Sequence, residues 1–288
     1  MKEREMTTTN LMMRLRPLAA GAITLAAVVL CWPNAGGAAT LAEIKQRGYM
    51  VVVTEDDFRP FEFVKDGKPT GFDNELLERL RKFAPFEIRQ EIIPWPGILA
   101  GVSTGKYDVA LTAAAITKER QPTLDFTMPL ADNSNYYAKR KADKTIQSVA
   151  DLNGKSFGLQ VGSVMKERLP ELQVMLNETN GKLGAMTEYN SFPDAYQDLA
   201  NGRIDYVINT YINLSELVRE KPNVFELGQK VSGRLMPAWA VKKGNAGVLA
   251  FLNSFLAQER ESGGLASLQT KWFGKSFDDL PLYWMSEF

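Results

Sequence analysis

The feature of this sequence that most constrains its fold is the alternation of short apolar segments with amphipathic ones. Apolar runs typical of buried strands occur at residues 49–54, 86–93, 107–114, 155–160, 183–189, 203–209, 224–227 and 236–241. Segments of helical periodicity lie between or beside them, at residues 40–48, 75–83, 98–104, 145–152, 164–176, 192–201, 211–221, 246–261 and 265–273. Strands that alternate with helices at this spacing predict an α/β fold with parallel sheets.

The first 39 residues have the order of an export signal. A polar start with basic side chains is followed by the apolar run 18–32 and by small residues that end at Ala39. This order predicts a periplasmic mature chain and a signal peptide cleaved after Ala39, with cleavage at Gly37 as the alternative. The apolar run is shorter than the about 20 residues that a membrane span needs, so we expect no membrane insertion after cleavage. Cys31 lies inside the signal, and Leu30 before it disfavours lipid attachment.

Composition excludes several kinds of site. The chain has no histidine, which removes Ser-His-Asp catalysis and histidine zinc sites, and its single cysteine lies in the predicted signal. We therefore expect no metal, no cofactor and no disulfide in the mature chain. Lysine and arginine together number 34, as do aspartate and glutamate, and this balance argues against nucleic acid as a partner.

The segment Asp108–Leu130 combines a predicted buried strand with a candidate anion site. Small apolar residues fill 109–115, and Thr117 to Arg120 has the pattern of a helix cap followed by a first helical turn. The guanidinium of Arg120 beside the free amides of a helix start would favour a carboxylate or a similar anion. The alternative is a solvated arginine on a short connector.

Nine short motifs, in order along the mature chain, carry a resemblance to a known family. They are Arg59–Phe63, Gly67 with Gly71–Asp73, Trp95–Ile98, Gly105–Asp108, Ile116–Arg120 with Asp125–Pro129, Gly154–Lys155, Gln160–Ser163, Asn201–Asp205 and Lys271–Gly274. With them the chain resembles the family-3 extracellular solute-binding proteins, the amino-acid-type receptors of ABC importers. The resemblance covers nearly all of the mature chain.

The resemblance implies an α/β, two-lobed type II periplasmic-binding-protein fold with the ligand cleft between the lobes. Lobe 1 would comprise residues 40–131 and the return segment 234–288, and lobe 2 residues 132–233. The two crossings of the chain, near Leu130–Asn135 and Lys230–Leu235, would absorb the dihedral changes of a hinge closure.

The resemblance also implies roles for individual residues. Phe58 and Trp95 would wall the ligand, Arg120 would bind its carboxylate, and the turn at Gly162 and Ser163 would close on it from lobe 2. Core packing for Phe58 and a hydrophobic staple for Trp95 are the simpler alternatives. Two aromatic residues beside Phe58 are assigned to the core, Phe61 and Phe63.

Two positions of the expected site depart from the resemblance. The family usually has a threonine five residues before the arginine, where this chain has Ala115 in a run that begins at Ala113. Amino-acid binders usually carry an aspartate for the ligand ammonium where this chain has Thr210. A buried ammonium without a charged partner loses on the order of 3–5 kcal/mol. The acidic residues that could replace the aspartate are Glu55, Asp56, Asp57 and Glu188. Otherwise the ligand would be a carboxylate without an α-amino group, or another small molecule with an apolar body.

We therefore expect a monomeric, non-enzymatic binding component of an ABC importer that closes around a small carboxylate-bearing ligand and delivers it to permease subunits. One alternative is a cyclohexadienyl or arogenate dehydratase-like enzyme on the same fold, with Glu188 or Glu55 as the acid. Another is a periplasmic accessory or sensory module that passes a ligand or a signal to a second protein.

Overall fold

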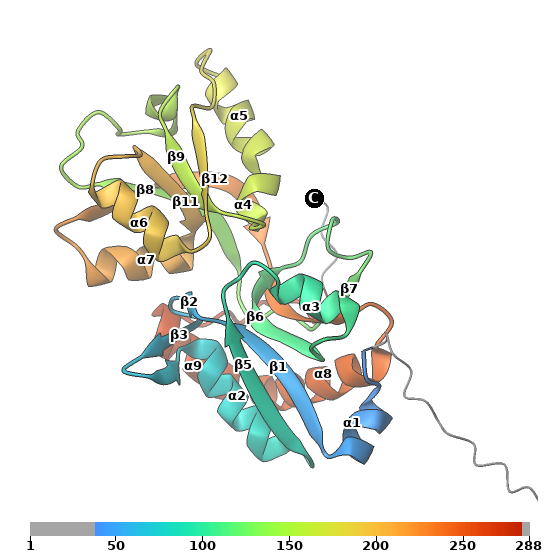
Figure 1. The fold of residues 1–288 in the computed structure, drawn as a ribbon. Coiled ribbons are helices and arrows are strands. Elements are labelled where there is room, and N and C mark those ends of the chain that lie inside the picture. Colours follow the sequence, from blue (N-terminus) through green and yellow to red (C-terminus); the bar gives the residue numbers. More distant parts are fainter. Residues whose placement is uncertain (1–37, 284–288) are drawn as a thin grey trace, which may run out of the picture. The chain divides into compact units, whose positions relative to one another are not determined.

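The protein is described here by a computed structural model that covers residues 38–283. The predicted signal peptide lies outside these residues except for its last two. Among residues 38–283, no helix has both the length and the apolar composition needed to span a membrane. The helices and strands form two separate five-stranded sheets with helices packed on them, and a small third sheet (Figure 1).

The first sheet contains strands from both ends of the described chain. Its order is β5 (Glu87–Ile93), β1 (Tyr49–Glu55), β6 (Val109–Ala115), β13 (Pro237–Lys242) and β7 (Leu124–Phe126). Successive residues of β1 face opposite sides of the sheet, so Val52 and Val53 belong to different apolar clusters. Both are fully buried, because helices cover both faces.

One face of the first sheet is covered by a single short helix. This is α3 (Ile98–Thr104), whose Ile98 and Val102 pack with Val53 and Tyr107. The other cluster extends into the second sheet, and the helices that contribute to it beside the first sheet are α1 (Leu41–Arg47), α2 (Phe72–Phe83), α8 (Ala246–Glu261) and α9 (Gly264–Phe273). The boundaries of α8 agree with the sequence prediction, because an uninterrupted apolar periodicity marks its whole length.

The second sheet is formed by the middle of the chain. Its order is β10 (Met186–Tyr189), β9 (Phe157–Gln160), β11 (Tyr206–Thr210), β8 (Asn133–Arg140) and β12 (Phe225–Leu235). Its helices are α4 (Val164–Glu167), α5 (Leu169–Asn177), α6 (Phe192–Ala200) and α7 (Tyr211–Glu220), with a 3-10 helix at Val149–Leu152. The helix predicted at 164–176, with an interruption near Pro170, is two helices, and Pro170 lies in the first turn of α5, where its missing N–H costs no hydrogen bond.

Both sheets are mixed, so the expectation of parallel sheets was wrong for part of each. β5, β1 and β6 are parallel, as are β10, β9 and β11. β8 runs antiparallel to β11 and to β12, while β13 runs antiparallel to β6 and to β7. The long strands β8 and β12 carry the chain into and out of the second sheet, and the direction of such a crossing is not encoded in strand–helix alternation.

The third sheet is a small antiparallel one at the end of β1. It consists of β2 (Asp57–Phe58), β3 (Glu62–Lys65) and β4 (Lys68–Thr70), with Lys65 paired to Lys68. Asp66 and Gly67 both have positive φ values, 52° and 73°, as the two-residue hairpin turn between β3 and β4 requires. The helix predicted at 145–152 is reduced to the 3-10 turn that starts at Val149.

The two stretches of chain between the main sheets contact each other. Arg234 pairs with Asp132 at 2.8 Å, and the backbone N–H of Asn135 donates to the Ser232 hydroxyl at 2.9 Å. The pairing of β12 with β8 shifts register twice between Leu227 and Arg234. Such irregular pairing suits a segment that bends. The lobe boundaries at 131 and 233, and the hinge itself, stay predictions.

Candidate functional site

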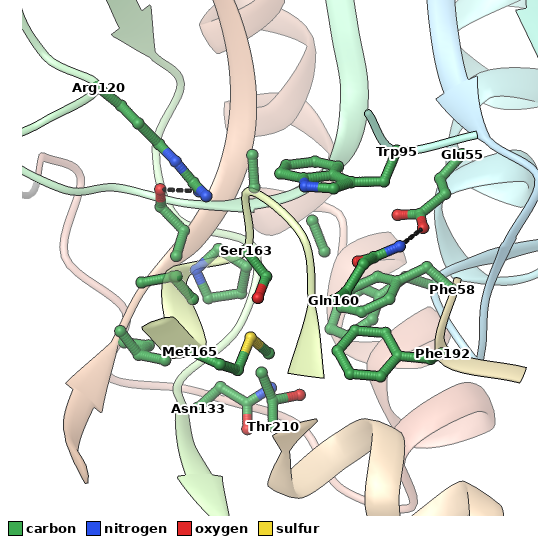
Figure 2. Close-up of a pocket in the computed structure, with 17 residues that line it drawn as sticks. Glu55, Phe58, Trp95, Arg120, Asn133, Gln160, Ser163, Met165, Phe192 and Thr210 are labelled. Carbon is green, nitrogen blue, oxygen red and sulfur yellow. Dashed lines mark hydrogen bonds between the residues drawn. The ribbon is translucent and has the colours of Figure 1, made fainter. Parts of the chain in front are cut away.

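A cavity lined by residues of both main sheets holds most of the predicted site residues. It takes in about 470 Å³ of space not filled by protein atoms, part of which is open to solvent. Figure 2 shows its lining side chains. Of the residues predicted from the sequence, the lining includes Glu55, Phe58, Trp95, Ala113, Ala115, Arg120, Ser163 and Thr210. Gly162 does not line it, but lies one residue away.

Arg120 reaches the cavity from a turn rather than from a helix. Residues 118–123 form turns in which the N–H groups of Arg120 and Gln121 donate to the Thr117 carbonyl, at 3.3 and 3.1 Å. The expected helix start was therefore wrong, because β7 begins at Leu124 and leaves no room for helical turns. A helix dipole does not contribute to this site. Any anion binding rests on the guanidinium.

The Arg120 side chain is buried with carbonyl partners. It is 7% exposed, donates through Nη1 to the Ala115 carbonyl at 2.9 Å and through Nη2 to the Gly162 carbonyl at 3.3 Å. Its ion pair is a long one, 4.0 Å from Nε to Glu167. Burial lowers the pKa of Arg120 from its ordinary value, against the opposing effect of Glu167 and Glu119. The guanidinium is thus desolvated and incompletely compensated.

Glu55 is the acidic residue of the cavity. It ends β1, is 3% exposed, and its Oε1 accepts a hydrogen bond of 2.6 Å from Gln160 of β9 (Figure 2). Burial raises the pKa of Glu55 to about 8, and the neighbouring charges of Asp56 and Asp57 add to the effect. Among the described residues, no lysine or arginine ion pair with Glu55 is present.

The other predicted acidic residues lie elsewhere. Glu188 is exposed on β10 and pairs with Lys166 at 2.9 Å, so it is not the cleft acid that the sequence suggested. Asp57 pairs with Arg59 at 3.1 Å outside the cavity. Side chains on a strand alternate between faces, and residue type alone does not reveal which face meets the cleft. Glu55 is left as the acid able to meet a ligand.

Two further buried carboxyl groups lie behind Glu55. Glu62 accepts a hydrogen bond from Thr112, and Asp73 accepts one of 2.6 Å from the Trp239 indole. Both are fully buried. Burial raises the pKa of Glu62 well above its usual range, with Asp73 and Glu55 adding to it, and raises that of Asp73 to about 6.

Aromatic rings form one wall of the cavity. Phe58 lies 5.8 Å from Phe61 and 5.9 Å from Phe192 of α6, measured between ring centroids. Phe61 and Phe63 are buried as expected, but Phe61 also lines the cavity. The Trp95 ring lies 5.4 Å from the Arg120 guanidinium carbon, which adds a cation–π contact.

The turn at Gly162 and Ser163 contacts Arg120. The Gly162 carbonyl accepts from Arg120, and the Ser163 N–H donates to the Gln160 carbonyl at 3.2 Å. The Ser163 hydroxyl is buried and has no hydrogen-bond partner among residues 38–283. The hydroxyl, rather than the backbone, is therefore the group of this turn that can meet a ligand.

Thr210 takes part in a contact between the two main parts of the fold. Its hydroxyl donates to Asn213 Oδ1, and Asn213 Nδ2 donates to the Arg59 carbonyl at 2.6 Å. Thr210 carries no charge, so it cannot replace an aspartate. The small side chains of Ala113 and Ala115 line the cavity, with Ala115 also supplying the carbonyl that binds Arg120.

Several cavity residues were missed from the sequence. They are Phe61, Ala114, Asn133, Gln160, Val164, Met165, Phe192, Leu235 and Pro237. Gln160 lay inside a quoted motif, and that position could have singled it out. Asn133 lies in a predicted crossing, where polar side chains are ordinary. Within residues 38–283, no group of three metal-ligating side chains of the His, Cys, Asp and Glu types is present.

Comparisons with known proteins identify a matching family and related sequences. The family described as bacterial extracellular solute-binding proteins, family 3, matches residues 50–275. The L-cystine-binding protein TcyJ of Escherichia coli K12 is 30% identical over 236 residues, which cover 81% of this chain and 86% of TcyJ.

Solved structures of amino-acid-binding proteins share the fold. The arginine-, lysine-, histidine-binding protein ArtJ of Geobacillus stearothermophilus has a TM-score of 0.71 and 25% identity, covering 80% of this chain and 96% of ArtJ. The ancestral amino acid-binding protein AncCDT-1, a precursor of cyclohexadienyl dehydratase, has a TM-score of 0.71 and 26% identity, covering 81% of this chain and 98% of that protein.

Proposed function

Because this chain belongs to family 3 of the bacterial extracellular solute-binding proteins, we propose that it captures an amino acid in the cavity between its two main sheets and passes it to an ABC importer. In this proposal Arg120 binds the ligand carboxylate and Glu55 binds the ammonium group. Phe58 and Trp95 enclose the ligand, and the chain crossings act as the hinge.

The observation that carries the proposal is the pair of buried groups of opposite charge type in one cavity. Arg120 is 7% exposed and Glu55 is 3% exposed, and neither has a short ion pair among the described residues. Burying either group in charged form is costly unless a partner of opposite charge arrives. A zwitterion supplies both partners at once. The absence of the usual aspartate at Thr210 is thereby offset by Glu55.

The proposal requires Glu55 to lose its proton when a ligand binds. Burial raises the pKa of Glu55 to about 8, so the empty site holds a neutral carboxyl group at pH 7. An ammonium group at hydrogen-bond distance favours the carboxylate form and lowers the pKa. Glu55 can therefore bind a cationic group of the ligand, yet the empty site carries no unpaired carboxylate charge.

The relatives support a binding protein rather than an enzyme. TcyJ and ArtJ are named as binding proteins for cystine and for arginine, lysine and histidine. The predicted export signal would place the mature chain in the periplasm, and the import function would require permease subunits as partners. Of the two candidate acids for a dehydratase-like reaction, Glu188 does not fit, because it is exposed and paired with Lys166.

A thermal-shift screen tests the proposal. The mature protein, unfolded and refolded to remove bound ligand, would be heated with the common L-amino acids and with the matching 2-hydroxy acids, which keep the carboxylate but lack the ammonium. A ligand that binds the folded state at 100 times its Kd adds about 2.7 kcal/mol to the unfolding free energy. We expect shifts with amino acids alone. Larger shifts with the 2-hydroxy acids would refute the role of Glu55 and leave Arg120 as the carboxylate site.

A further inference from the structure

Asn133, which the sequence did not single out, lines the cavity, and its amide nitrogen has no hydrogen-bond partner among the described residues. It starts β8, is 5% exposed, and lines the cavity together with Thr210 and Met165 (Figure 2). Its Nδ2 atom is buried and has no hydrogen-bond partner among residues 38–283. A buried donor of this kind is expected to be satisfied when the site is occupied.

The orientation of this amide is determined by two backbone donors. The N–H of Ser134 donates to Asn133 Oδ1 at 3.0 Å, and the N–H of Ile212, in the first turn of α7, donates to the same oxygen at 3.4 Å. Because backbone N–H groups can only donate, the atom that they contact is the oxygen. The nitrogen is therefore the free end of the Asn133 side chain.

Thr210 supplies the complementary group. Its hydroxyl proton is used in the hydrogen bond to Asn213 Oδ1, and its backbone N–H donates to Asn209 Oδ1 at 2.7 Å. The Thr210 oxygen can therefore only accept a further hydrogen bond. Asn133 and Thr210 thus give the cavity one neutral donor and one neutral acceptor, and Glu55 is the only carboxylate among the residues that line it.

We propose that Asn133 contacts the ligand directly and selects amino acids whose side chain ends in a carboxamide. The ligand carbonyl would accept from Asn133 Nδ2, and the ligand amide nitrogen would donate to the Thr210 oxygen. This rests on the proposed function, in which Arg120 and Glu55 hold the carboxylate and the ammonium. A ligand with a cationic side chain would bring only hydrogen-bond donors to the Asn133 donor. A ligand with an acidic side chain would bring a negative charge close to the lone pairs of the Thr210 oxygen. Both mismatches leave buried groups unsatisfied.

The test is a calorimetric panel with glutamine, asparagine, glutamate, lysine and alanine. Wild-type protein is expected to bind one of the two carboxamides at least tenfold more tightly than glutamate or lysine, and Asn133→Ala should reduce this ratio at least tenfold. Alanine, whose side chain has no polar group to pair with Asn133, should bind both proteins within about twofold of each other. Asn133→Asp should weaken carboxamide binding and improve lysine binding, since a carboxylate then meets the cation.

An asparagine outside the cavity and the crossings serves as a control that separates contact from general damage. Asn177 is exposed at the end of α5 and does not line the cavity, so Asn177→Ala should leave the ligand ratios unchanged. Thermal unfolding without ligand shows whether each variant is folded. If the Asn133 variants do not fold, the wild-type panel still decides the matter, because tighter binding of lysine or glutamate than of either carboxamide overturns the inference.

The outcomes distinguish this inference from the proposed function. If wild-type protein binds no amino acid, or if Arg120→Ala binds them as tightly as wild type, the proposed function fails. If amino acids bind but Asn133→Ala weakens all of them equally, including alanine, Asn133 has only a structural role and the selectivity inference alone is overturned.

Discussion

Ligand binding should expel a proton from Glu55, and the size of the effect follows from its burial. With the pKa of Glu55 raised to about 8, roughly nine in ten empty molecules are protonated there at pH 7. Only the carboxylate form pairs with an ammonium group. The apparent affinity should therefore rise about tenfold per pH unit well below pH 8, by roughly 50-fold in total between pH 6 and pH 8, and become nearly constant above that.

The same raised pKa sets the direction of the stability change. Between its ordinary pKa of 4.5 and about 8, the folded, empty protein holds a proton on Glu55 that the unfolded chain has released. Stability from this group is therefore fully present below pH 4.5 and is lost as the pH rises towards 8, by up to about 1.4 kcal/mol per pH unit. Glu55→Gln should remove this loss, so the empty variant should be more stable than wild type at pH 8.

Isothermal titration calorimetry measures the number of protons released when the ligand binds. Titrations at pH 7 in buffers with different ionisation enthalpies should show about 0.9 proton released per ligand bound by the wild type, and none from Glu55 in the Gln variant. Glu62 and Asp73 also titrate nearby, so the variant is needed to assign the proton. Glu188→Gln changes a surface glutamate paired with Lys166 and should keep the wild-type profile.

Two results would refute this reasoning. One is a wild-type affinity that stays constant from pH 6 to pH 8, since a buried neutral carboxyl cannot then be part of the ligand site. The other is a Glu55→Gln variant that keeps the wild-type pH slope, which would assign the proton to another group.

Three further changes probe the cavity, the closure and the fold. Arg120→Ala should weaken carboxylate ligands by about 2–3 kcal/mol, because a charge-assisted pair is lost, and calorimetry that finds less than a threefold change would contradict the assigned role. Asn213→Ala removes the 2.6 Å hydrogen bond to the Arg59 carbonyl, which links the two main parts of the fold, and should cost about 1 kcal/mol of ligand affinity. Small-angle scattering should then report a more open empty protein. Unchanged affinity and scattering would show that this contact does not hold the two parts together. Gly71→Ala places a Cβ 2.4 Å from the Phe61 carbonyl oxygen at a φ of 116°, so denaturant unfolding should show a loss of more than about 2 kcal/mol, and a loss below 0.5 kcal/mol would be at odds with this packing.

Local patterns were sufficient for much of the fold. The helix at Ala246–Glu261 was predicted at its observed position, since apolar periodicity acts within a few residues. The helix expected at Thr117 was wrong, because β7 begins shortly after it and pairs with β13 from the far end of the chain. Short segments of this kind are decided by their partners rather than by their own propensity.

By itself, the sequence determined the family, the two-lobed α/β architecture, and the nomination of Arg120, Phe58 and Trp95 as binding residues, because each depends on short motifs in a recognisable order. The tertiary structure alone decided which acid enters the cavity. Glu55 is buried beside Gln160, whereas Glu188 is exposed beside Lys166, although both are glutamates on strands. The tertiary structure also reveals that the buried amide nitrogen of Asn133 has no hydrogen-bond partner among the described residues. Burial and hydrogen-bond partners come from residues far apart in the chain, and no local pattern encodes them.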